Sequence, residues 1–260
     1  MPERICVFCQ REVDAWLPWE HPAAALSEFI VRLDTIGSNV KRFWCPHCRS
    51  HDRERHLRLY LDRLDILPKL RGGHVLHVAP EGHLRHYIAS HEFPLLIRGD
   101  LNPTEDSIQR VDLQSLEFPD AAFDLVICNL VLEHVEELPQ ALSELYRVLQ
   151  KGGRLICQTP YSERLSKTFE EPALQMSADR LFFYGQEDHV RLFGANILDH
   201  FTNAGFVSRL RPHAEVLPDI DPERYGVNER EPFFDVVVPM EVGRRRWRNR
   251  HVRRFIGARA

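Results

Sequence analysis

Residues 124–159 read DLVICNLVLEHVEELPQALSELYRVLQKGGRLICQT, with an apolar run at each end and an amphipathic stretch between them. The two runs, 124–130 and 154–159, each have the length of a buried strand. Between them Leu138–Leu149 carries leucine at helical intervals on one side, and two following glycines are a helix stop. A strand, a helix and a strand in this order predict a βαβ unit in a parallel sheet.

The same alternation continues in both directions along the chain. Two further apolar runs, 74–79 and 95–100, come before this unit. A helical pattern at 196–203 and two β-rich runs, 206–211 and 233–240, come after it. Residues 53–70 also place leucines and a tyrosine on one helical face. We therefore expect an α/β fold built on a mostly parallel sheet that is flanked by helices.

Composition excludes several classes of protein and divides the chain by charge. With 260 residues, 43% of them apolar, the chain can bury a full core, which rules out collagen-like and fully disordered proteins. The net charge of -4 is a sum of unlike parts: 12 basic against 10 acidic residues in 1–73, 14 against 27 in 74–240, and 8 against 1 in 241–260. The acidic middle segment disfavours a nucleic-acid site there. The Arg-rich tail could bind a polyanion, or it could be a solvated terminal segment or a helix packed on the acidic body.

Four of the six cysteines form two C-x2-C pairs, Cys6 with Cys9 and Cys45 with Cys48. Two such turns can supply the four thiolates of a tetrahedral zinc site, which would be closed and structural. His51 and His56 are alternative ligands, and four unrelated buried thiols are the other explanation. We expect residues 1–52 to be a small zinc-binding module, and the last two cysteines, 128 and 157, to be core residues.

The beginning of the chain lacks the basic and apolar regions of a secretory signal. No run approaches the roughly 18 apolar residues that a membrane span needs. The expected location is therefore the cytoplasm, where cysteines stay reduced and serve as metal ligands.

Acidic residues follow two of the predicted strands. In open α/β sheets ligands bind beyond the carboxyl ends of the strands, so the residues there are candidates for contact. Asp100 ends the second strand and could accept hydrogen bonds from a ribose diol. Asp112 follows a third strand, which precedes the run at 124–130, and could accept a hydrogen bond from an adenine amino group. The alternative for either residue alone is a solvated loop carboxylate.

Two segments carry a resemblance to a known family. Residues 111–135 (VDLQSLEFPDAAFDLVICNLVLEHV) and 144–156 (ELYRVLQKGGRLI) resemble the signature of class I S-adenosylmethionine-dependent methyltransferases of the type 11 kind. The resemblance implies a Rossmann-like seven-stranded sheet over residues 53–240 and S-adenosylmethionine as the cofactor. Residues 45–50 and 184–191 resemble a branch of bacterial methyltransferases that has an N-terminal zinc knuckle.

The loop after the first strand departs from the family pattern. The family has an acidic residue and then G-x-G-x-G there, whereas this chain has His77 at the acidic position and Ala79, Glu81 and His83 at the glycine positions. Either Glu81 takes over recognition of the cofactor's ammonium group, or cofactor binding is weakened or lost. The predicted cofactor contacts are His77, Ala79, Glu81, Gly82, Asp100, Leu101, Asp112, Leu113 and Asn129.

Methyl transfer needs an aligned acceptor and, for a hydroxyl acceptor, a group that removes its proton. His134, just beyond the fourth strand, is the first candidate as a base or acceptor-orienting group; its alternative is a structural histidine under the cofactor. His189, with Asp188 and Arg191, is the rival constellation. These three lie in an insertion, 160–195, that we expect to cover the acceptor. Tyr161 and Tyr184 are the further acceptor candidates, or else ordinary loop residues.

The expected function is O-methylation, or less favourably N-methylation, of a small molecule or glycan. Asn129 is followed by Leu130 rather than by the prolines of the Asn-Pro-Pro-Tyr turn that is typical of base methylation in this fold. Two alternatives stay open: a catalytically silent zinc-binding scaffold, and an RNA methyltransferase guided by the basic tail, 241–260. The sequence does not determine the oligomeric state.

Overall fold

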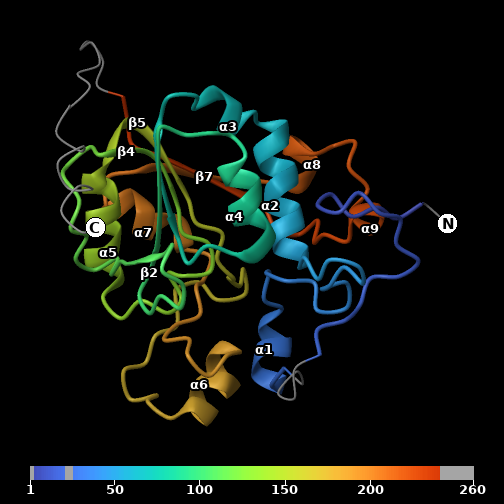
Figure 1. Cartoon of the computed structure of the whole chain (residues 1–260). Helices are drawn as coiled ribbons and strands as arrows, with labels where there is room; N and C mark the ends of the chain where they lie inside the picture. The colour runs from blue at the N-terminus through green and yellow to red at the C-terminus, as the bar shows by residue number, and fades with distance from the viewer. Residues whose placement is uncertain (1–2, 21–25, 241–260) are drawn as a thin grey trace.

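The computed structural model describes residues 3–20 and 26–240, and it contains one seven-stranded sheet (Figure 1). The strand order is β3-β2-β1-β4-β5-β7-β6. β7 is antiparallel to both of its neighbours, and the other pairs are parallel. This confirms the expected Rossmann-like, mostly parallel sheet. The strands are β1 (His74–Val78), β2 (Leu95–Asp100), β3 (Gln109–Arg110), β4 (Phe123–Ile127), β5 (Leu149–Ile156), β6 (Val207–Arg211) and β7 (Phe233–Val237).

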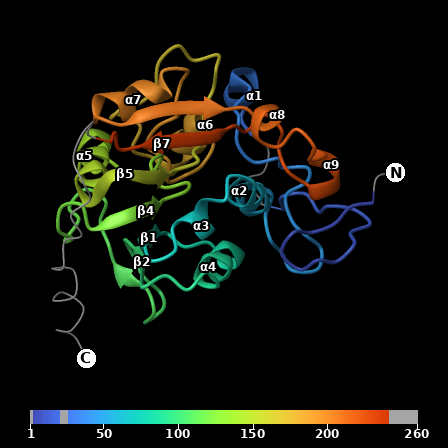
Figure 2. The same ribbon diagram turned by 90° about the horizontal axis from the view of Figure 1, so that it is seen from above.

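Helices cover both faces of the sheet (Figure 2). One face packs against α5 and α7, and the other against α2, α3, α4 and α8. The leucine stripe predicted for the central helix is buried on the first face, so the 3.6-residue period identified its inward side. The helices are α1 (Glu28–Leu33), α2 (Asp52–Arg63), α3 (Ile66–Lys69), α4 (Gly82–Ala89), α5 (Leu138–Val148), α6 (Ser177–Tyr184), α7 (Ile197–Asn203), α8 (His213–Val216) and α9 (Pro222–Tyr225).

Two predicted boundaries are wrong for local reasons. β5 begins at Leu149, immediately after α5, rather than at Arg154. Gly152 does not stop the helix but lies inside the strand at φ 74°, where the β4–β5 register shifts. The helix expected over 53–70 is two helices, because Asp65 adopts a left-handed conformation (φ 54°) between α2 and α3.

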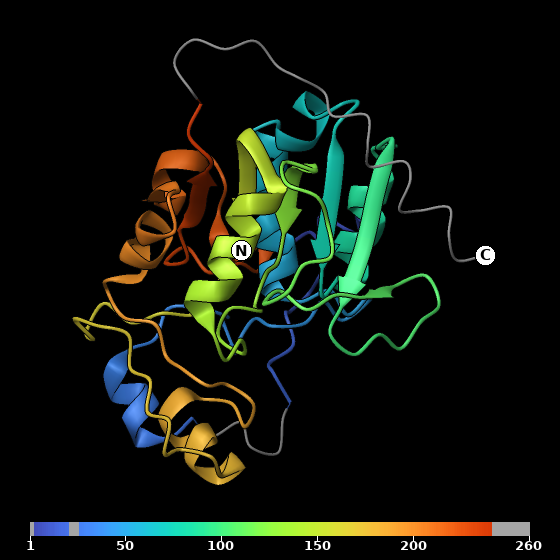
Figure 3. The same ribbon diagram turned by 90° about the vertical axis from the view of Figure 1, so that its left-hand side faces the viewer.

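The predicted insertion, 160–195, folds together with α1 beyond the carboxyl ends of the strands. Figure 3 shows α1 and α6 side by side there, and helix contacts join them. Their shared core is mostly aromatic: Phe29 lies 5.2 Å from the ring of Phe183 and 6.0 Å from that of Phe169. A segment between the two cysteine pairs therefore completes this cover over the edge where ligands bind in open α/β sheets.

The N-terminal segment is bonded to the rest of the chain through Arg55 of α2, whose side chain is fully buried. Its guanidinium lies over the ring of Trp16 at 4.2 Å. Its N–H groups donate to the backbone carbonyls of Ser50, Arg42, Phe43, Tyr225 and Gly226. One side chain thus joins residues before Asp52, helix α2 and the turn after α9.

Two further expectations concern the C-terminal tail and a membrane span. The Arg-rich tail, 241–260, lies outside the described residues. Among residues 3–20 and 26–240, no helix is long and apolar enough to cross a bilayer.

Candidate active site and cysteine cluster

The structure brings together the four cysteines that the sequence pairs. Cys6 Sγ lies 3.7 Å from Cys48 Sγ, and Cys9 Sγ lies 3.9 Å from Cys45 Sγ. A tetrahedral ion with Zn–S bonds of about 2.3 Å requires sulfurs about 3.8 Å apart. All four sulfurs lie within 4.8 Å of one another, so the donor set and its spacing fit zinc.

The two knuckles have the same backbone design. In each, the first cysteine's carbonyl accepts from the residue after the second cysteine: Gln10 N to Cys6 O at 2.9 Å, and Arg49 N to Cys45 O at 3.0 Å. Gln10 and Arg49 both have positive φ, 58° and 61°. Burial opposes ionisation of Cys6, but hydrogen bonds from Ser50 and the Cys9 and Phe8 backbone outweigh it and hold the pKa of this thiol at about 7. Burial, the largest cause, raises the pKa of the Cys45 thiol to about 12 and also raises that of Cys9, so these thiols lose their protons to the metal ion when it binds.

At the carboxyl end of β1, Glu81 is the centre of a polar network. His77, fully buried, has its Nε2 3.2 Å from Glu81 Oε2, and Asn129 Nδ2 donates to Glu81 Oε1 at 3.3 Å. Asn129 Oδ1 in turn accepts from Gln158 N at the end of β5. Glu81 thus joins the ends of β1, β4 and β5, close to where the family's acidic residue would stand at position 77.

Backbone strain is present at two strand ends of this edge. Ala79 follows β1 with φ 47°, and Leu130 follows β4 with φ 55°. A left-handed conformation costs a residue with a Cβ about 1–2 kcal/mol, and such strain often lies at functional sites. Ala79 therefore keeps the left-handed turn that a glycine would adopt at this position without a penalty.

The loop is held from its other side by the cysteine cluster. His83 Nε2 lies 2.7 Å from the carbonyl oxygen of Cys48, and its ring packs 5.4 Å from that of Phe8. Glu54 of α2 accepts from the backbone N–H groups of His83 (2.8 Å) and Leu84 (3.3 Å), which open α4. Sequence reasoning missed Glu54. It is one of four polar residues that α2 buries, with Asp52, Arg55 and His56, and no sequence pattern distinguishes it from them.

The two predicted acidic residues lie at the carboxyl ends of β2 and β3: Asp100 is the last residue of β2, and Asp112 follows β3 by two residues. Asp100 Oδ1 accepts from Asn102 N at 2.8 Å, and Asp112 Oδ1 accepts from Gln114 N at 2.9 Å. Each bond orients a carboxylate at the carboxyl edge. Leu101 beside Asp100 is exposed, whereas Leu113 is buried, so only the first could be covered by a ligand without moving.

On the acceptor side, Glu133, His134 and His189 form a second cluster. One ligand atom from each lies within 4.8 Å of the others, and the two imidazole rings are 4.7 Å apart, edge to face. Asp188 Oδ2 is 3.3 Å from His134 Nδ1. Glu133 Oε2 accepts from the hydroxyl of Thr159, a residue the sequence did not single out, at 2.8 Å. The two predicted histidines therefore lie side by side.

Arg191 fastens this cluster instead of facing solvent. Its side chain is fully buried, and it pairs with Glu170 at 2.9 Å. Its other donors bond the carbonyls of Leu132, Val135 and Glu136, and Val190 N donates to Glu133 O. The segment after β4 and the segment 188–191 are thus locked to each other.

The two predicted acceptor tyrosines are buried. Tyr161 makes bridge contacts with Ile36 and Phe193, and burial raises its pKa to about 12. Tyr184 accepts from Glu171 N at 2.9 Å, and its carbonyl lies 3.2 Å from His189 Nδ1. Both tyrosines pack inside the cover that α1 and residues 160–195 form over the site. Contact of either tyrosine with a methyl acceptor stays a prediction.

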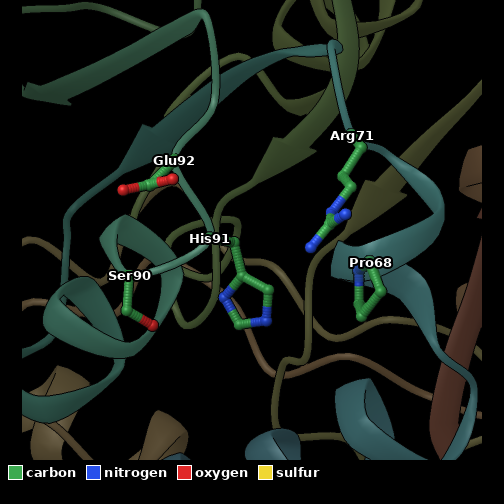
Figure 4. A pocket seen from close by; sticks show the side chains of 5 residues that line it. All are labelled: Pro68, Arg71, Ser90, His91 and Glu92. Atoms are coloured by element: carbon green, nitrogen blue, oxygen red, sulfur yellow. The ribbon is translucent and has the colours of Figure 1, made fainter.

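A hollow of about 570 Å³ lies elsewhere, at the amino ends of the strands (Figure 4). Arg71 precedes β1, His91 and Glu92 precede β2, and Figure 4 shows Arg71 and His91 pointing toward each other. Pro68 and Ser90 complete its lining. Because ligands in this architecture bind at the opposite edge, this hollow does not contribute to the candidate site.

The central segment of the chain matches a known protein-family model. Residues 94–157, from β2 to the end of β5, match the model described as a methyltransferase domain. The matched segment includes Asp100, Asp112, Asn129 and the Glu133-His134 pair. It covers about a quarter of the chain.

Curated relatives match over short stretches. A malonyl-[acyl-carrier protein] O-methyltransferase of Erwinia billingiae is 37% identical over 71 residues, 27% of this chain and 28% of that protein. A demethylmenaquinone methyltransferase of Listeria monocytogenes is 36% identical over 85 residues, 31% of this chain and 35% of that protein. The chain thus spans about a third or less of the length of these relatives.

Among solved structures, an S-adenosylmethionine-dependent methyltransferase of Mesorhizobium loti aligns with 68% of this chain and 94% of its own. Its identity is 16% and the TM-score is 0.45. The fold assignment therefore depends on the strand order and register of this protein itself.

Proposed function

We propose that this protein is an S-adenosylmethionine-dependent methyltransferase that acts on an oxygen of a small molecule or glycan. The observation that carries the proposal is the convergence of Glu81, Asp100 and Asp112 at the carboxyl edge of a sheet whose central segment matches a methyltransferase domain. Buried or oriented polar groups that converge on one edge are typical of a ligand site.

Each carboxylate has a distinct task in this proposal. Asp100 would accept hydrogen bonds from the ribose diol, and Asp112 one from the adenine amino group. Glu81, braced by His77 and Asn129, would bind the ammonium group of the cofactor's methionine part by charge-assisted hydrogen bonds. An acid four residues beyond the usual position thereby replaces the missing one.

The cofactor supplies an electrophilic methyl group. When this cofactor is bound, the acceptor oxygen would take its methyl carbon as the carbon–sulfur bond breaks and its electrons go to sulfur, and the hydroxyl proton would leave to a base. His134 would take that proton or orient the acceptor, a role supported by its partly exposed side chain beside Asp188. Burial, as the largest cause, lowers the pKa of His189, which keeps this second imidazole neutral and able to accept.

Zinc would be structural. Four cysteine ligands leave no position for a substrate, and the cluster contacts the cofactor loop through the Cys48 carbonyl rather than through the ion. The cover made of α1 and 160–195 would enclose the acceptor over the cluster of histidines.

Calorimetry with S-adenosylhomocysteine tests the proposal. The wild-type chain should bind this product, and Glu81→Gln, which keeps shape and loses charge, should weaken binding by about 2 kcal/mol, roughly 30-fold. Asp100→Ala should weaken it comparably. Glu105→Gln, a carboxamide substitution on an exposed loop, is the control that should leave affinity unchanged.

Absence of binding to the zinc-loaded wild type would refute the proposal and favour the silent scaffold. Binding that Glu81→Gln leaves intact would retain the methyltransferase but remove Glu81 from ammonium recognition. An RNA acceptor would require binding that falls steeply with salt and disappears on deletion of 241–260.

A further inference from the structure

We infer that Glu133, His134 and His189 form a second metal site, for a divalent transition-metal cation that holds the oxygen acceptor. These residues come from the turn after β4 and from the segment after α6, and two imidazole nitrogens and a carboxylate oxygen lie within 4.8 Å of one another. Two histidines and one carboxylate form a donor set that leaves positions on the ion open.

His189 has the arrangement of a metal ligand that lacks its ion. Its Nδ1 lies 3.2 Å from the carbonyl oxygen of Tyr184, so this nitrogen carries the proton and donates. Its Nε2 is then an acceptor, yet this atom is buried and has no hydrogen-bond partner among the residues that the structure describes. A donated bond to a carbonyl at the other ring nitrogen is the usual support of a ligating histidine.

Glu133 supplies a second, independent observation. Its side chain is 1% exposed, and within the described residues its one hydrogen-bond donor is the neutral hydroxyl of Thr159. Buried carboxylates are normally paired with a cation or coordinate a metal. With Asp188 beside His134 the cluster holds two carboxylates, and a divalent cation would balance both charges.

The cluster is mounted firmly enough to select an ion by geometry. Arg191 clamps the carbonyls of 132, 135 and 136, and Val190 N bonds Glu133 O at 2.9 Å. Asp188 Oδ2 lies 3.3 Å from Nδ1 of His134, and Nε2 of that ring is left for the ion. Ligands on two interlocked segments keep their spacing whether or not the ion is bound.

The role of the ion depends on the proposed function and narrows its substrate. Open positions beside the proposed methyl donor would take two neighbouring oxygens of the acceptor, as in a diol. With the ion bound, His134 would hold the ion and orient the acceptor rather than act as the base. A cation lowers the pKa of a hydroxyl that it binds, as it does for water, so proton removal would not require a strong base. The acceptor class is therefore an oxygen chelator.

Cobalt binding to the zinc-loaded full-length protein tests the site. The protein is loaded with one equivalent of zinc, which the four thiolates of the cysteine cluster take up and, because zinc exceeds cobalt in affinity for a given site, retain when cobalt is added. Added Co2+ then reports on the second site. We expect one equivalent of Co2+, with an absorption spectrum that lacks sulfur-to-cobalt charge transfer. Glu133→Gln and His189→Gln should each weaken binding at least tenfold, and His86→Gln, an exposed histidine on α4, should not.

His134→Gln protects the test against misfolding, because this side chain is partly exposed and its loss should also weaken Co2+ at least tenfold. No Co2+ beyond the zinc, or equal Co2+ affinity in all variants, would overturn the inference. S-adenosylhomocysteine binding without Co2+ binding would refute the metal site alone. Co2+ binding without S-adenosylhomocysteine binding would keep the site and refute the proposed function.

Discussion

Replacement of Arg55 by Met tests whether the cysteine cluster and the sheet domain are one cooperative unit. The guanidinium is fully buried and donates to five backbone carbonyls from three segments. Burial, the largest cause, lowers its pKa, but the pKa of arginine is so high that the side chain stays charged. Methionine preserves the length of the stem and removes every donor.

The expected loss of stability follows from the buried backbone carbonyls that Arg55→Met leaves without a donor. Loss of one member of a buried charged network costs about 3–5 kcal/mol, since the remaining polar groups stay buried. At about 2.1 cal/mol/K per residue, the 260 residues have an unfolding entropy of about 0.55 kcal/mol/K. A loss of about 4 kcal/mol therefore lowers Tm by about 7 °C.

Differential scanning calorimetry of the zinc-loaded protein measures the effect. Arg58→Met, on the same helix, is the matched control: Arg58 packs on Tyr87 at 4.4 Å and pairs with Asp62 at 3.6 Å, but is partly exposed. Its loss should cost about 1 kcal/mol and about 2 °C. If both variants melt within about 2 °C of each other, or if Arg55→Met splits the transition and leaves the sheet domain at its original Tm, the reasoning is refuted.

Three further outcomes concern the cofactor loop held by the cysteine cluster, the buried Glu231 and the strained turn at Ala79. Removal of zinc by a chelator should weaken S-adenosylhomocysteine binding measured by calorimetry. His83→Ala in zinc-loaded protein should weaken the same binding by about 1 kcal/mol, roughly fivefold. Unchanged affinity in both would disprove that the cysteine cluster supports the cofactor loop. Burial raises the pKa of Glu231 to about 7 from an ordinary 4.5, so its stabilising proton is held at low pH and lost as the pH rises through 7. Denaturant unfolding should show Glu231→Gln gaining about 2–3 kcal/mol on wild type between pH 5 and pH 8, whereas a constant difference would contradict the raised pKa. Ala79→Gly should raise stability by about 0.5–1 kcal/mol, because relief of the left-handed strain exceeds the entropy cost of glycine; a lower Tm would count against strain at this turn.

Most of the sheet was predictable because buried parallel strands are short apolar runs that need no distant partner to be identified. β2 was predicted with its observed bounds, and β1 and β4 to within a few residues. β5 was not, since Gln150 and Lys151 interrupt its apolar pattern and its bulge depends on pairing with β4 and β7. Hydrophobic periodicity carries no information about such a bulge.

The sequence also predicted one part of the candidate site and not the other. Asp100, Asp112 and Asn129 were predictable, because topology alone brings strand ends to one edge. The pairing of His134 with His189 was not, since it depends on how 160–195 returns to the sheet. Glu54 and Thr159 make their contacts with partners more than 25 residues away, which no local pattern encodes.

The departure from the glycine-rich loop has a structural explanation in the cysteine cluster. Glycine at position 83 could not bond the Cys48 carbonyl, and glycine at 81 could not join His77 to Asn129. A glycine-rich loop is shaped by its freedom to turn, whereas this loop is shaped by side chains anchored on both sides, with Glu54 fixing the start of α4. The side chains of Glu81 and His83 therefore make hydrogen bonds that glycines could not make. The conformation of this loop then depends on the folded knuckle of Cys45 and Cys48, which His83 contacts.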